Sequence, residues 1–221
     1  MQVGTARYVK EGDFPSLLPV FPLSGALLLP EGHLPLNIFE PRYMQMFDDA
    51  LGSHRLIGMI QPQIGVEESN HPALSSVGCI GRITSFSETS DGRYVVGVTG
   101  VARFRLLEEC TSTKPYRSVR FAPFMSDLSA DDTEESVDRD NLLKVFRDFL
   151  DANNLDADWE SVERASNRVL VNSLSMMSPF GAAEKQALLE AADLKSRAET
   201  LIAITEVVLA QDSGDSSRTL Q

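Results

Sequence analysis

Prolines interrupt the most apolar stretch of this chain, between Leu18 and Leu51, and this feature limits the fold more than any other. Proline lacks a backbone donor and fixes its own φ, so the stretch cannot form one helix. Proline is nevertheless well suited to the first position of a helix. The sequence therefore predicts a helix that begins at Pro41 and stops at Gly52, preceded by extended segments at 19–23, 26–29 and 34–38.

The spacing of apolar residues changes after Pro123. Before it, short apolar runs alternate with turn signals such as Asp91-Gly92, which is typical of strands, here expected at 56–60, 77–88, 94–101, 103–107 and 116–121. After it, apolar residues recur at helical spacing and predict helices around 137–150, 159–174, 183–191 and 194–209. Strands followed by helices indicate an α+β protein with a closed or nearly closed β structure.

The net charge of −12 is unevenly distributed, since residues 126–160 contain 12 acidic and 3 basic residues. We interpret this segment as a solvated linker and helix face, with an acidic docking surface as the alternative. The overall field disfavours nucleic acid as a partner. Apolar runs fall short of the roughly 20 residues that cross a bilayer, and the N-terminus resembles no signal peptide. We therefore expect no membrane association and a cytoplasmic protein with free Cys79 and Cys110.

Motifs for common chemistries are missing from the sequence. It has no phosphate-binding glycine loop, no zinc-type histidine pair and no nucleophile elbow. The neighbouring carboxylates Asp48-Asp49 and Glu67-Glu68 do not face one another on a helix or loop. Lys185 is expected to be exposed, and loop positions predict solvated side chains for His33, His54 and His71. We expect no enzyme activity, no cofactor and no metal.

Several arginines of the β-rich part could form a basic patch. Arg103 and Arg105 flank Phe104 on a predicted strand, and a basic patch could also include Arg82, Arg93, Arg117 and Arg120. Arginines interleaved with aromatic residues on a sheet can bind single-stranded nucleic acid. The alternative is that outward arginines balance nearby acids and keep the sheet soluble. The nearly neutral charge of residues 1–125 favours this second interpretation.

An ordered set of motifs resembles the N-terminal, substrate-binding domain of Lon proteases over roughly residues 17–210. The set consists of Leu18 to Leu23, Leu29-Pro30, Leu34 to Tyr43, Val77 to Ile83, Gly92 to Phe104 and Glu184 to Glu190. The resemblance implies a twisted, PUA-like β pseudo-barrel followed by a helical bundle. The expected divisions are a lead-in at 1–16, a β-rich subdomain at 17–123, a helical subdomain at 124–211 and a flexible tail at 212–221.

The resemblance is greatest to short stand-alone bacterial members, because the ATPase and Ser/Lys peptidase modules of Lon are missing from this chain. It implies a non-enzymatic module that binds unfolded or peptide-like protein segments, with other proteolysis components as further partners. RNA binding through the PUA-like β module is the alternative.

The segment from Phe39 to Tyr43 has two interpretations, and its candidate substrate-binding residues are Phe39, Glu40, Arg42 and Tyr43. In the structural one, Glu40 caps the helix, Tyr43 packs inward, and Arg42 pairs with a carboxylate or reaches loop carbonyls. In the functional one, Arg42 and Tyr43 line a groove between the β module and its helix. We favour the structural interpretation, because residues at helix starts usually cap or pack.

Overall fold

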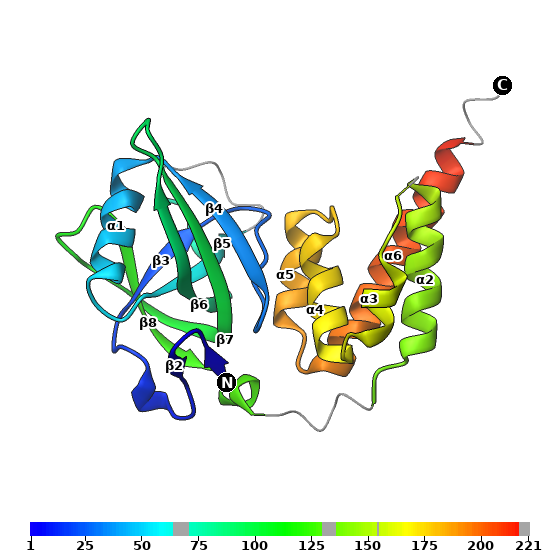
Figure 1. Ribbon diagram of the computed structural model, residues 1–221, viewed down its shortest axis with the longest axis horizontal. Coiled ribbons are helices and arrows are strands. Elements are labelled where there is room, and N and C mark those ends of the chain that lie inside the picture. The colour runs from blue at the N-terminus through cyan, green and yellow to red at the C-terminus, as the bar shows by residue number, and fades with distance from the viewer. Residues whose placement is uncertain (64–70, 130–135, 154, 217–221) are drawn as a thin grey trace. The chain divides into compact units, whose positions relative to one another are not determined.

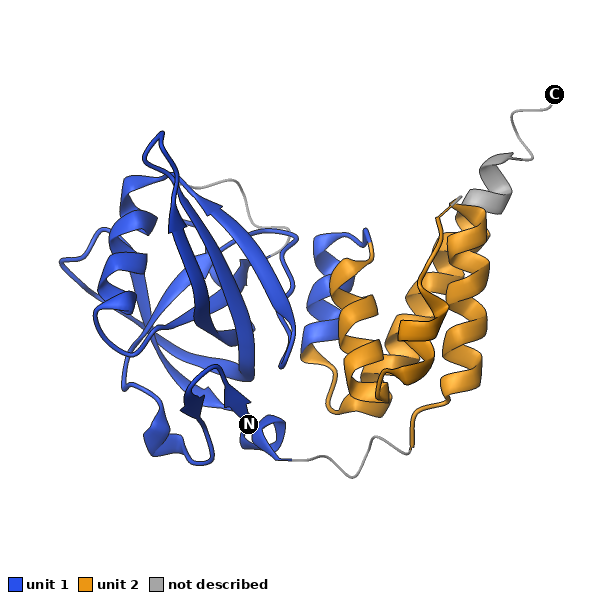
Figure 2. Ribbon diagram, viewed as in Figure 1, with its two compact units in different colours: residues 1–131, 179–189 blue, residues 132–178, 190–221 orange. Residues whose placement is uncertain are grey.

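The computed structural model describes residues 1–63, 71–129, 136–153 and 155–216, so the Glu67-Glu68 pair lies outside the described residues. The chain divides into two compact units (Figure 2). Unit 1 comprises Met1–Asp131 and Pro179–Leu189, and unit 2 comprises Asp132–Ser178 and Glu190–Gln221. The sequence-based division differs, because it assigned all of 124–211 to the helical part.

Unit 1 is built on a sheet that closes on itself. Its strands are β3 (Leu18–Pro22), β4 (His33–Ile38), β5 (Leu56–Pro62), β6 (Leu74–Glu88), β7 (Tyr94–Cys110) and β8 (Arg117–Pro123). The strand order is β4-β7-β6-β5-β3-β8, and β7 also pairs with β8, which closes a ring of five strands (Figure 1). The β3–β5 pair is parallel, and the other pairs are antiparallel. This arrangement agrees with the predicted pseudo-barrel.

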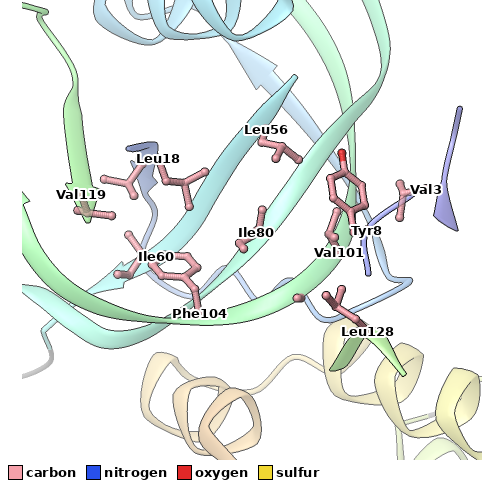
Figure 3. Packing of buried hydrophobic residues seen from close by; sticks show 12 residues of the cluster. Val3, Tyr8, Leu18, Leu56, Ile60, Ile80, Val101, Phe104, Val119 and Leu128 are labelled. Atoms are coloured by element: carbon pink, nitrogen blue, oxygen red, sulfur yellow. The ribbon is translucent and has the colours of Figure 1, made fainter. Parts of the chain in front are cut away.

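The core of unit 1 lies inside this ring. Leu18, Ile80 and Phe104 are fully buried, and Figure 3 shows side chains from several strands converging on the same interior. Helix α1 (Pro41–Leu51) packs beside it and contacts β3. The rings of Phe21 and Tyr43 meet edge to face with centroids 4.3 Å apart, which anchors the first turn of α1.

Three local expectations for this unit differ from the structure. Residues 1–16 are more than a lead-in, because Val3 and Tyr8 join the core, and β1 (Gln2–Val3), β2 (Ala6–Arg7) and the 3-10 helix η1 (Glu11–Asp13) form there. Residues 26–29 form no strand, although Leu27, Leu28 and Leu29 are buried. The two strands expected at 94–101 and 103–107 are one strand, β7, since its first half pairs with β4 and its second half with β8.

Helix α5 (Ala182–Glu190) belongs largely to unit 1. Polar side chains hold it there. Gln186 donates to the Val77 carbonyl at 3.2 Å, and Gln61 of β5 donates to Gln186 Oε1 at 3.1 Å and to the Ala182 carbonyl at 3.0 Å. Lys185 was expected to be exposed, but it is half-buried, and its Nζ donates to the Gly25 carbonyl at 3.0 Å.

Unit 2 consists of helices whose starts are capped by polar side chains. They are α2 (Arg139–Ala152), α3 (Trp159–Arg164), α4 (Asn167–Met177) and α6 (Leu194–Ser216). Asp138, Asp158 and Ser166 each accept a backbone N–H of the first turn, and Asp193 accepts the Ser196 N–H. Part of the acidic segment therefore has a structural role, because negative charge is favourable at helix N-termini.

Two helix boundaries differ from the sequence prediction. The single helix expected over 159–174 is split into α3 and α4, because Ser166 starts a new helix by accepting the Val169 N–H. Helix α6 continues to Ser216, whereas the tail was expected to start at residue 212. In the described part of the chain, no helix is both long and apolar enough to cross a bilayer.

Candidate functional site

A groove of about 920 Å³ opens on unit 1 beside α1. One side, the α1 wall, is formed by Arg42 and Tyr43. A second part of the lining, the loop wall, is the connection from β7 to β8 at residues 111–116, which contributes Thr111, Ser112, Lys114, Pro115 and Tyr116. The remaining lining residues are Pro22, Pro62, His71, Pro72, Glu109, Cys110 and Arg117. The groove thus combines prolines and tyrosines with polar and charged side chains.

The α1 wall presents a cation stacked on an aromatic ring. The Arg42 guanidinium lies 4.5 Å from the centroid of the Tyr43 ring, and its side chain is 47% exposed. Tyr43 is buried, and this burial raises the pKa of its hydroxyl. Arg42 Nη2 also pairs with Glu40 Oε2 at 2.8 Å, so one partner predicted for Arg42, a carboxylate, is present.

Only half of the predicted site residues line the groove. Arg42 and Tyr43 do, whereas Phe39 and Glu40 are not among the lining residues. Phe39 is 63% exposed just after β4. Glu40 occupies the N-cap position of α1, but its side chain makes no capping hydrogen bond, because its carboxylate binds Arg42 instead. Glu40 is therefore the N-cap residue at the start of α1, as predicted, but the capping is done by its backbone carbonyl, which accepts the Met44 N–H at 3.0 Å, and not by its side chain.

The carboxylate of Asp49, near the end of α1, connects the α1 wall to the loop wall. Its Oδ2 accepts the Tyr116 hydroxyl at 2.6 Å and Lys114 Nζ at 2.9 Å. These hydrogen bonds lower the pKa of Asp49, while burial and the bond to Asp49 raise the pKa of Tyr116. Sequence reasoning missed this contact, since Asp49 and Tyr116 are separated by 67 residues and belong to no local pattern.

A second carboxylate, Glu109 on β7, organises the other end of the groove lining. Arg117 Nε donates to its Oε1 at 2.7 Å, and His71 lies 3.0 Å from the same oxygen. Arg117 Nη1 also donates to the Pro72 carbonyl at 2.8 Å. The bonds from Arg117 are the largest cause of the lowered pKa of Glu109. Both acids near the groove are thus occupied by neighbouring donors.

The titration of Asp49 should reveal the contact directly. We expect its midpoint below the ordinary value of 3.8, and we expect Tyr116→Phe to move that midpoint upward. A lowered pKa in the folded state adds stability above the ordinary value, and this stability is lost as the pH falls through the lowered value. The contact is therefore complete at neutral pH. Carboxyl carbon shifts measured by NMR during acid titration would test this.

The control for that titration is Tyr94→Phe, because the Tyr94 hydroxyl is directed at the adjacent Asp48, at 3.4 Å. This variant should leave the midpoint of Asp49 unchanged. An Asp49 midpoint that is the same with and without the Tyr116 hydroxyl would contradict the assigned cause.

The arginines considered for nucleic-acid binding have other partners. Arg103 is buried and paired with Asp127, and Arg82 donates to the Tyr8 hydroxyl and the His54 carbonyl. Arg93, Arg117 and Arg120 pair with Asp91, Glu109 and Glu108. Arg105 is exposed, with its guanidinium 5.6 Å from the Phe124 ring centroid. These arginines therefore do not form an unpaired basic patch in the described structure.

The histidines and cysteines have separate environments. His33 is exposed, His54 has a pKa lowered by burial, and His71 lines the groove beside Glu109. Cys79 is a free thiol in the core, and Cys110 is a half-buried free thiol on the groove lining. In the described ranges, no three His, Cys, Asp or Glu side chains gather closely enough to hold a metal ion.

Sequence comparison identifies relatives of nearly the whole chain. A family model for the substrate-binding domain of ATP-dependent protease La (Lon) matches residues 17–206. The Lon protease of Parabacteroides distasonis is 32% identical over 204 residues, and that of Anaeromyxobacter dehalogenans is 26% identical over 209 residues. The aligned regions cover 88% and 90% of this chain but only 24% of each relative.

Solved structures support the same fold. The Lon N-terminal domain protein from Xanthomonas campestris matches with a TM-score of 0.63 and 21% identity, covering 86% of this chain and 98% of that one. The N-terminal domain of Lon protease from the Mycobacterium avium complex matches with a TM-score of 0.65 and 19% identity, at the same coverage.

Proposed function

Because the chain belongs to the family of Lon substrate-binding domains, we propose that it is a non-enzymatic module that binds unfolded or peptide-like protein segments. We place the bound segment in the groove between the α1 wall and the loop wall. Arg42 and Tyr43 are its contacts on the α1 wall. Phe39 and Glu40, which do not line the groove, are proposed to contact chain that extends beyond it.

The observation that carries this proposal is that two cations on the groove lining, Arg42 and Lys114, are partly exposed to a ligand. Asp49 and Glu109 already accept bonds from Lys114, Tyr116 and Arg117. Arg42 and Lys114 are 47% and 46% exposed, so both cations remain accessible to a ligand. An extended polypeptide offers one backbone carbonyl acceptor per residue, and its apolar side chains suit the tyrosines and prolines of the lining.

The proposal extends to the setting in which the module works. A module that holds unfolded segments would act with other proteolysis components, and we assign it to the cytoplasm. The groove carboxyls Asp49 and Glu109 have lowered pKa values, which makes them poor general bases at neutral pH. The arginines described above lend no support to the RNA-binding alternative.

Binding can be measured by fluorescence anisotropy with labelled, reduced and carbamidomethylated α-lactalbumin. This probe is unfolded and acidic, which limits non-specific attraction to a chain of net charge −12. We expect saturable binding, and we expect Arg42→Gln to weaken it about tenfold, since about 1.4 kcal/mol corresponds to that factor. Glutamine retains part of the aliphatic portion of the arginine side chain but carries no charge.

The matched control is Arg93→Gln, which removes another exposed, acid-paired arginine that does not line the groove. It should bind like the unmodified protein. An anisotropy that stays flat up to about 100 μM protein would exclude the proposed function. Any remaining affinity would then correspond to a binding free energy weaker than about 5–6 kcal/mol. Equal losses in the two variants would exclude the groove as the binding site.

A further inference from the structure

Asp49 holds the two sides of the groove together at one end. It lies seven residues after Arg42 on α1, so both residues are on nearly the same helix face, about 10 Å apart along the axis. Arg42 belongs to the α1 wall, whereas the Asp49 carboxylate reaches across to Lys114 and Tyr116 of the loop wall. The same helix face therefore forms one wall and restrains the other.

The loop wall has few other polar ties to α1. Among the described residues, the side-chain hydrogen bonds and ion pairs from 111–116 to α1 all end on the Asp49 carboxylate. Within the loop, the Lys114 N–H is accepted by the Ser112 hydroxyl at 3.1 Å, which shapes the turn but does not attach it to the helix. Loss of one carboxylate would thus release both contacts at once.

We propose that Asp49 is the positioning residue that sets how far the groove opens, and thereby how tightly a polypeptide segment is held. This inference rests on the proposed function only for the bound segment, and the position of the loop wall can be tested without any ligand. The pairing of β7 with β8 fixes the two ends of the loop, and the Asp49 carboxylate restrains its middle, because hydrogen bonds to a charged acceptor are stronger than neutral ones.

The test compares Asp49→Ala with Asp48→Ala. Both variants remove one negative charge near the C-terminal end of α1 and introduce the same good helix former, so their effects on the helix itself are matched. Among the residues that the structure describes, the Asp48 carboxylate accepts the long 3.4 Å hydrogen bond from Tyr94 and makes no hydrogen bond or ion pair with the loop wall. A difference between the two variants in Cys110 reactivity or in probe affinity therefore reports the loss of the hydrogen bonds from Lys114 and Tyr116 to Asp49.

The first measurement is the rate at which iodoacetamide modifies Cys110, read by peptide mass spectrometry. Cys110 lines the groove, and Cys79 is fully buried, so Cys79 serves as an internal control for global unfolding. We expect Asp49→Ala to raise the Cys110 rate at least about fivefold over Asp48→Ala, with the Cys79 rate unchanged. Asp49→Glu should restore part of the protection.

The second measurement is the affinity for the labelled α-lactalbumin probe. We expect Asp49→Ala to weaken binding about fivefold relative to Asp48→Ala. Equal Cys110 rates in the two variants would overturn the proposal, and so would a raised rate with unchanged affinity. If the unmodified protein fails to bind the probe while Asp49→Ala still raises the Cys110 rate, Asp49 positions the wall and the proposed function is what fails.

Discussion

Replacing Asp127 by alanine is expected to lower the free energy of unfolding of unit 1 by about 3–5 kcal/mol, because it leaves a buried cation without its partner. The carboxylate accepts the Arg103 backbone N–H, Nε and Nη2, each at 2.9 Å. The side chains of Arg103 and Asp127 are only 5% and 10% exposed. Arg103 Nη1 also donates to the Leu189 carbonyl at 3.2 Å, so the pair helps to hold α5 on unit 1.

The control is Glu108→Ala, which breaks an exposed ion pair between Glu108 on β7, the strand that carries Arg103, and Arg120 on β8. Glu108 and Arg120 are 3.6 Å apart, and both side chains are more than 60% exposed. Exposed pairs contribute about 0–1 kcal/mol, so this variant should be nearly neutral. Because the chain has two units, urea unfolding should be followed by hydrogen exchange at β6 and β7 peptides, while Trp159 fluorescence reports on unit 2. An equal decrease in the free energy of unfolding of unit 1 in both variants would contradict the prediction.

Replacing Gly100 by alanine should destabilise unit 1 by about 3 kcal/mol or more, because the added Cβ has no space. It would overlap the backbone carbonyl oxygen of Leu29 and lie 2.7 Å from the carbonyl carbon. The two segments cannot easily separate, since the Gly100 N–H donates to the Gly32 carbonyl at 2.9 Å and its own carbonyl accepts the Glu31 N–H at 3.0 Å. Hydrogen exchange of β7 during urea unfolding would measure the loss.

Gly97→Ala is the matched control on the same strand. There the added Cβ would meet the ends of two side chains, Ser85 Oγ and the ring of the exposed His33, both of which can rotate away. We expect a loss of about 1–2 kcal/mol. A Gly100→Ala protein as stable as Gly97→Ala would mean that the 29–32 segment moves aside without cost.

The local signals in the sequence predicted much of the fold. Proline at Pro41 correctly indicated the start of α1, and the turn signal at Asp91-Gly92 correctly separated β6 from β7. Such signals work because they act through a residue's own backbone and its nearest neighbours. The core residues Val3 and Tyr8 were missed, since Val3 lies in a two-residue strand and Tyr8 just after another, and such short strands carry no detectable alternation.

The candidate site was predicted only in part. The groove interpretation of Arg42 and Tyr43 was the less favoured of the two, and both residues lie on the lining of the groove on unit 1. The favoured structural interpretation also describes them, because Tyr43 packs on Phe21 and Arg42 pairs with Glu40. Whether either residue binds a substrate remains a prediction.

The loop wall and Asp49 were not predicted. In the sequence, Asp48 and Asp49 looked equivalent. In the described structure, Asp49 is the one that accepts hydrogen bonds from Lys114 and Tyr116. Helix geometry separates adjacent residues by about 100°, so the packing of α1 decides which of the two faces the loop.

The sequence by itself determined the α+β class, the change from strands to helices after Pro123 and the family resemblance, because these depend on periodicity, local turn chemistry and motif order. Only the tertiary structure decided which charged groups are buried and which ones meet. Arg103 was interpreted as an outward arginine, and it does alternate with the core residue Phe104 along β7. It is nevertheless buried, because the 3-10 helix η2 (Met125–Leu128) brings Asp127 to it and α5 brings the Leu189 carbonyl. The physical reason is that contacts between distant residues depend on strand register and sheet closure, which no short stretch of sequence encodes.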